Sequence, residues 1–91
     1  MPAKHLAVHG RVQGVWYRGW AVETARALGL TGWVRNRGDG TVEAVVAGDA
    51  AAVSRFIAEA HCGPAAARVT AIDVSDCPPQ DFDGFGQRPT A

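Results

Sequence analysis

The 91-residue sequence lacks an excess of charge of either sign. Nine lysine and arginine side chains balance nine aspartate and glutamate side chains, and charged residues make up 20% of the chain. A dedicated nucleic-acid-binding domain carries a basic patch or stripe, so this balance argues against DNA or RNA as a partner. Any anion that the chain binds is therefore expected to be small.

Long apolar runs and a secretion signal are also missing. No run of about 18 apolar residues is present to span a membrane, and the N-terminus lacks the basic and apolar regions of a signal peptide. We therefore expect a cytoplasmic protein with no membrane partner. A hydrophobic content of 47% predicts one packed domain over residues 1–91, with its core at about 4–86. Disorder is expected only at residues 87–91 and in the Pro78–Pro79 turn.

Cysteine is scarce, and the candidate metal ligands are few. Cys62 and Cys77 are too far apart for a CxxC motif and are expected to remain thiols. His5 and His9 would share one face of a strand, which makes a metal pair conceivable. A closed metal site takes four ligands, however, and no third ligand is nearby in the sequence. We therefore expect no metal site.

Apolar residues recur with periods that predict both strands and helices. The expected strands cover residues 4–10, 32–36, 41–47 and 68–76, with a possible edge strand at 82–86, and the expected helices cover 19–28 and a segment that Asp49 caps. The glycines of residues 37–40 suit a tight turn. This βαββαβ order predicts an α+β, ferredoxin-like sandwich, in which a mainly antiparallel sheet has both helices on one face.

A glycine-punctuated segment from Gly10 to Arg18 connects the first predicted strand to the first predicted helix. Gly10 and Gly14 can adopt backbone angles that other residues avoid, so the N–H groups between them can converge on an anion. Arg18 adds a permanent charge and a fork of donors that fits phosphate oxygens. The positive end of the following helix would face the same place. The segment therefore predicts a site for a small anion such as phosphate.

Other chemistries fit the sequence less well. The segment lacks the Gly-Lys-Ser/Thr ending of a nucleotide-binding P-loop. Four aspartates near the C-terminus do not have the spacing of a calcium loop and are expected to form a solvated acidic face; they are Asp73, Asp76, Asp81 and Asp83. The three tryptophans could stack on bases, but the balanced charge favours packing and pocket-wall roles; they are Trp16, Trp20 and Trp33.

Two parts of the chain resemble the signatures of the acylphosphatase family. Residues 8–18, Val-His-Gly-Arg-Val-Gln-Gly-Val-Trp-Tyr-Arg, are similar to the first signature almost position for position. Residues 32–36, Gly-Trp-Val-Arg-Asn, with Gly-Thr-Val-Glu at 40–43 and Gly48, are similar to the second. The resemblance covers roughly residues 5–86. It implies a ferredoxin-like enzyme that hydrolyses acyl phosphates to a carboxylate and inorganic phosphate without a cofactor.

The resemblance also implies roles for individual residues. Arg18 matches the family's phosphate-binding arginine, and Asn36 matches the asparagine that positions the attacking water. The residues that match the phosphate-binding loop are Gln13, Gly14, Val15, Trp16 and Tyr17. Tyr17 stands where phenylalanine is commonest, and Arg37 stands where many members have a small hydroxyl residue, so the role of Arg37 stays open. A phosphate or sulfate ion is expected to bind in this loop.

Three hypotheses follow from these observations. The favoured one is a monomeric, stand-alone acylphosphatase acting on a small acyl phosphate, because the chain contains both Arg18 and Asn36. The second is a non-catalytic binding module on the same fold. The third is an acylphosphatase-like domain of a larger carbamoyl-transferring enzyme. The sequence leaves the physiological acyl group and the oligomeric state open.

Overall fold

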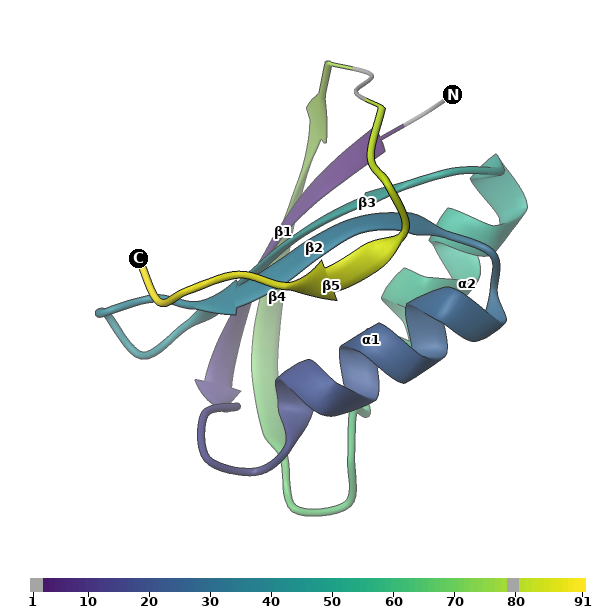
Figure 1. Cartoon of the computed structure of the whole chain (residues 1–91). Coiled ribbons are helices and arrows are strands. Elements are labelled where there is room, and N and C mark those ends of the chain that lie inside the picture. Colours follow the sequence, from purple (N-terminus) through teal and green to yellow (C-terminus); the bar gives the residue numbers. More distant parts are fainter. Residues whose placement is uncertain (1–2, 79–80) are drawn as a thin grey trace.

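The computed structural model, which describes residues 3–78 and 81–91, is a sandwich of one five-stranded sheet and two helices (Figure 1). The elements in chain order are β1 (Ala3–Arg11), α1 (Tyr17–Ala27), β2 (Thr31–Asn36), β3 (Val42–Ala47), α2 (Ala50–Ala60), β4 (Arg68–Cys77) and β5 (Phe85–Gln87). Both helices lie on the same side of the sheet (Figure 1). The predicted ferredoxin-like α+β fold is confirmed, and its final short strand is present.

The sheet has the strand order β4-β1-β3-β2-β5, and all neighbouring strands are antiparallel except β2 and β5. Val8 of β1 lies opposite Val42 of β3, which in turn lies opposite Asn36 of β2. The end of β1, the start of β3 and the end of β2 therefore meet at one end of the sheet. Residues opposite one another point to the same face. Asn36 thus shares the face of the buried Val8 and Val42, which the helices cover.

The helices pack on the sheet through stripes of small and apolar side chains. Ala21 and Ala25 are buried on α1, and Val53, Phe56 and Ala60 are buried on α2. The Asp49 carboxylate accepts hydrogen bonds from the N–H groups of Ala51 and Ala52, so the predicted cap of α2 is confirmed. Within the described residues, neither helix is long and apolar enough to cross a membrane.

The last residues of the chain lie along β2. The N–H of Arg88 donates to the carbonyl of Val34, and the N–H of Ala91 donates to the carbonyl of Asn36. The expected disorder of residues 87–91 is therefore wrong, because this segment satisfies backbone groups at the edge of β2 that would otherwise be unpaired. Pro79, which belongs to the other expected disordered turn, lies outside the described residues.

Candidate functional site

The loop between β1 and α1 consists of residues 12–16 and is anchored to the hydrophobic core. The Val12 side chain is buried in the core, and Val15 packs against the core from its edge. Gly14 and Trp16 are exposed. Gly14 has a φ of 74°, a left-handed conformation that favours glycine. The apolar anchors therefore hold the loop while its glycine-containing turn faces solvent.

Gly10 does not belong to this loop. It lies in β1, where a bulge between His9 and Gly10 shifts the pairing with β4. Its φ is 121°, and a β-carbon there would lie 2.0 Å from the carbonyl oxygen of Arg68. Gly10 thus has the unusual backbone angle that the sequence predicts, but it lies outside the loop, and the close approach of β4 explains this glycine.

Helix α1 begins at Tyr17, two residues before the predicted start at residue 19. Trp16 precedes it with φ 68° and ψ 19°, a left-handed conformation that costs a bulky residue about 1–3 kcal/mol. No side chain caps this helix end, and its first turn has no acidic residue. The first N–H groups of α1 and the positive end of its dipole are thus available to an anion. Arg18 lies inside this first turn.

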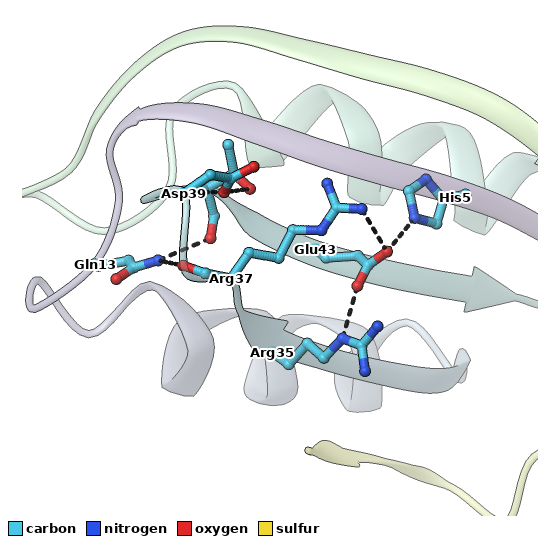
Figure 2. Close-up of polar contacts among 7 residues, drawn as sticks. His5, Gln13, Arg35, Arg37, Asp39 and Glu43 are labelled. Carbon is cyan, nitrogen blue, oxygen red and sulfur yellow. Dashed lines mark hydrogen bonds and ion pairs between the residues drawn. The ribbon is translucent and has the colours of Figure 1, made fainter. Parts of the chain in front are cut away.

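Gln13 joins the loop to the turn between β2 and β3 (Figure 2). Its amide Nε2 donates to the carbonyl oxygens of Arg37, at 2.8 Å, and Thr41, at 2.9 Å. These two acceptors lie on either side of the turn. The Gln13 side chain therefore brings the loop beside Asn36, the last residue of β2. Nothing in the local sequence signals this role, because the partners are 24 and 28 residues away.

Arg18 and Asn36 have polar groups without protein partners. Within residues 3–78 and 81–91, no carboxylate forms an ion pair with the half-buried Arg18. In the same residues, Asn36 Oδ1 is a buried acceptor with no hydrogen-bond partner. Leaving such an oxygen unpaired costs about 1–3 kcal/mol. Both side chains thus remain able to bind a donor or an anion that comes from outside the chain.

Tyr17 points into the core. Only 3% of this residue is exposed, and its hydroxyl donates to the carbonyl oxygen of Ala60, at the end of α2, over 2.7 Å. Burial raises the pKa of the Tyr17 hydroxyl above its usual range. Any contact of Tyr17 with an anion in the loop must therefore come from its backbone N–H.

The face of the sheet opposite the helices carries a charge cluster around Glu43, shown in Figure 2. Glu43 is 5% exposed, and its carboxylate lies 2.6 Å from His5 Nε2, 2.7 Å from Arg35 Nε and 3.2 Å from Arg37 Nη2. Burial raises the pKa of Glu43. Hydrogen bonds from His5 and Arg35 and the charges of both arginines lower it by more, so the pKa of Glu43 lies below its ordinary value. Arg37 is therefore engaged on the face opposite Asn36.

The histidines pair with carboxylates rather than with each other. His9 Nε2 lies 2.9 Å from Asp73, as His5 lies near Glu43. The described part of the chain contains no cluster of three or more histidine, cysteine or acidic side chains able to hold a metal ion. A pocket of about 200 Å³ between β2 and β5 includes Trp33 and Arg88. It includes neither Arg18 nor Asn36, so it is separate from the site that the sequence predicts.

Comparisons with known proteins agree on one family. The model of a family described as Acylphosphatase matches residues 4–86. A protein named acylphosphatase from Azoarcus sp. (strain BH72) is 57% identical over 90 residues, which cover 99% of this chain and 92% of that protein. The crystal structure of acylphosphatase from Bacillus subtilis has a TM-score of 0.93 and 32% identity, covering 97% of this chain and 99% of its own. The T. kodakarensis HypF crystal structure has a TM-score of 0.84 and 36% identity, covering 97% of this chain but only 12% of that one.

Proposed function

The chain belongs to the acylphosphatase family and hydrolyses acyl phosphates, and we propose that Arg18 binds the phosphoryl group while Asn36 positions the attacking water. The observation that supports this proposal is a pair of side-chain groups without partners in the described residues, one in the first turn of α1 and one at the end of β2. In the described residues, the Arg18 guanidinium has no carboxylate partner, and Asn36 Oδ1 accepts no hydrogen bond. Gln13 joins their two segments.

Residues 13–18 supply the phosphate cradle. The uncapped N–H groups of the first turn of α1 and the helix dipole favour an anion at this point. The left-handed turn at Gly14 allows neighbouring N–H groups to converge on one centre. Gln13, Val15, Trp16 and Tyr17 contribute backbone groups to this cradle, and Arg18 adds bidentate hydrogen bonds and a full charge.

Asn36 orients the nucleophile without deprotonating it. Its buried Oδ1 accepts a hydrogen bond from the attacking water, which relieves the cost of leaving that oxygen unpaired. The water attacks phosphorus in line with the departing oxygen. As the new P–O bond forms, the bond between phosphorus and the bridging acyl oxygen breaks, and its electron pair leaves on the carboxylate. The water's proton passes to a phosphoryl oxygen, so the other product is inorganic phosphate.

We propose that the reaction needs neither a metal nor a cofactor. The departing carboxylate has a conjugate acid with a pKa of about 4–5, so it leaves without protonation by a general acid. Arg18 and the N-terminal end of α1 neutralise the charge on the equatorial oxygens.

The chain acts as a cytoplasmic monomer in this proposal. In support, the exposed thiol of Cys62 suits a reducing compartment.

The test is phosphate release from benzoyl phosphate by the purified protein in the presence of a chelator. Arg18→Ala and Asn36→Ala are each expected to lower kcat/KM by about a hundredfold or more, because each removes a group aimed at the transition state. The two variants separate the two roles. Arg18→Ala raises the inhibition constant of inorganic phosphate, whereas Asn36→Ala lowers kcat and leaves that constant nearly unchanged.

Arg55→Ala is the matched control. Arg55 is an exposed arginine of α2 whose partner is Glu59, far along the chain from the loop. This variant is expected to keep full activity. Full turnover by a folded Asn36→Ala variant would contradict the assigned role. A folded wild-type protein that binds phosphate but releases none would favour the non-catalytic binding module.

A further inference from the structure

Trp16 is a large apolar side chain that the fold leaves in solvent. It is 58% exposed, and Val74 on β4 is the other large apolar side chain among the described residues that is exposed. Trp16 lies in the candidate phosphate loop, between Gly14 and Arg18. Its indole is therefore exposed at the solvent side of this loop.

Two local features hold the indole in this exposed position. Trp16 is the one non-glycine residue in the described part of the chain with a positive φ, and this conformation separates its side chain from the core. Gly19, the third residue of α1, makes room for the ring. A β-carbon at Gly19 would lie 2.2 Å from Trp16 Nε1 and 2.6 Å from Cε2. The indole therefore lies against the first helical turn because residue 19 has no side chain.

The direction of the reaction places the acyl group near this indole. Asn36 lies on the helix-covered face of the sheet, and in the proposed mechanism its buried Oδ1 holds the attacking water, which therefore approaches phosphorus from the side of the sheet. In-line displacement puts the departing oxygen on the opposite side of phosphorus. The acyl group attached to that oxygen therefore projects outward to the solvent rim of the loop, where Trp16 lies.

We infer that Trp16 determines acyl-group specificity, with its indole packing against a planar, aromatic acyl group and favouring it over a small aliphatic one. Aromatic rings gain additional attraction in stacked or edge-to-face contacts, and the indole offers a large surface for both. This inference rests on the proposed function of Arg18 and Asn36. It concerns the discrimination between substrates, not the ability to hydrolyse them.

The test compares kcat/KM for benzoyl phosphate with kcat/KM for acetyl phosphate, expressed as a ratio. The fraction of folded enzyme cancels in this ratio, so a partly folded variant remains informative. Trp16→Gly removes the indole and suits a positive φ, so the loop backbone is retained. The ratio is expected to fall about tenfold in Trp16→Gly, equivalent to one aromatic contact, while Trp16→Phe keeps most of it.

Gly19→Ala tests the position of the ring without removing it. The added methyl group displaces the indole from the first turn but leaves every backbone N–H in place, and the ratio is again expected to fall. Trp33→Ala is the control, because this indole lies on the opposite face of the sheet beside Arg35 and Arg88. An unchanged ratio in Trp16→Gly, or an equal loss for both substrates, overturns the inference. A wild-type protein inactive on both substrates instead contradicts the proposed function.

Discussion

At the scale of single residues, Tyr17 connects the start of α1 to the end of α2. Its hydroxyl donates to the carbonyl oxygen of Ala60, which no longer has a helical partner at the end of α2. The ring lies so close to Gly63 that a β-carbon there would be 2.6 Å from Tyr17 Cε2. The hydroxyl that distinguishes Tyr17 from the commoner phenylalanine therefore has a structural role in the core.

Tyr17→Phe is expected to lower the free energy of unfolding by about 1–2 kcal/mol, because it leaves the buried Ala60 carbonyl without a donor. Activity at low temperature is expected to stay close to the wild-type value, since the hydroxyl points away from the loop. Urea denaturation followed by circular dichroism measures the change in stability. Equal midpoints for the two proteins would show that the hydrogen bond contributes nothing net.

At the scale of elements, the β1–α1 loop and the β2–β3 turn behave as one unit because Gln13 joins them. Its amide satisfies two backbone carbonyls of the turn, and no other side chain of the loop reaches across in the described structure. The turn itself is stabilised by Asp39, whose carboxylate accepts from the N–H and hydroxyl of Thr41. The relative position of Arg18 and Asn36 therefore depends on a residue that we do not expect to touch the substrate through its side chain.

Gln13→Ala is expected to lower kcat/KM by about tenfold or more, because small displacements of binding groups weaken transition-state contacts strongly. The inhibition constant of inorganic phosphate is expected to rise with it, which a loss of stability alone would not cause. Steady-state kinetics with phosphate as inhibitor measures both quantities. Gln87→Ala in β5 is the control glutamine, and equal behaviour of the two variants would refute the positioning role of Gln13.

At the scale of the whole molecule, the two faces of the sheet have different chemistry. The helices cover an apolar face, while the opposite face carries the cluster of Glu43, His5, Arg35 and Arg37. Because the pKa of Glu43 lies below its ordinary value of 4.5, the folded protein binds fewer protons than the unfolded chain near that pH. The stability from Glu43 is therefore fully present above its unfolded-state pKa and is lost as the pH falls through its folded-state pKa.

Glu43→Gln is expected to destabilise the protein by about 1–3 kcal/mol at neutral pH, because it removes charge-assisted hydrogen bonds to a buried carboxylate. The difference from wild type is expected to shrink as the pH falls below 4.5. A smaller acid dependence remains in the variant, because hydrogen bonds from Thr41 also lower the pKa of Asp39. Thermal unfolding between about pH 3 and about pH 7, which spans the pKa values of carboxyl groups, measures the difference in stability between the two proteins.

Glu59→Gln is the control for this experiment. Glu59 pairs with Arg55 on the exposed side of α2, where an ion pair contributes little, about 0.3–0.5 kcal/mol. A Glu43→Gln variant that differs from wild type by the same amount at every pH would contradict the proposed linkage.

The helices and strands and their order along the chain follow from local patterns of residue types. Apolar spacing predicts both helices and the first four strands, because the periods of 3.6 and 2 residues depend on neighbouring positions. The possible edge strand at 82–86 is present as β5, shifted to Phe85–Gln87. The cap of α2 by Asp49 is also predictable, because a helix cap joins residues that are close together in the sequence. The glycine-punctuated segment points to Arg18, and the resemblance to the second acylphosphatase signature points to Asn36; their catalytic roles remain predictions.

Contacts between groups that are distant in the chain become visible only in the folded molecule. The acceptors of Gln13, the inward direction of Tyr17 and the pairing of Arg37 with Glu43 all depend on the register between separate strands and helices. Gly10 shows the same limit. The sequence pattern assigns this glycine to the loop, whereas the strand that requires it is β4, more than 50 residues away in the chain. Local periodicity carries no information on such contacts, because their energy appears only when the sheet forms and buries them together.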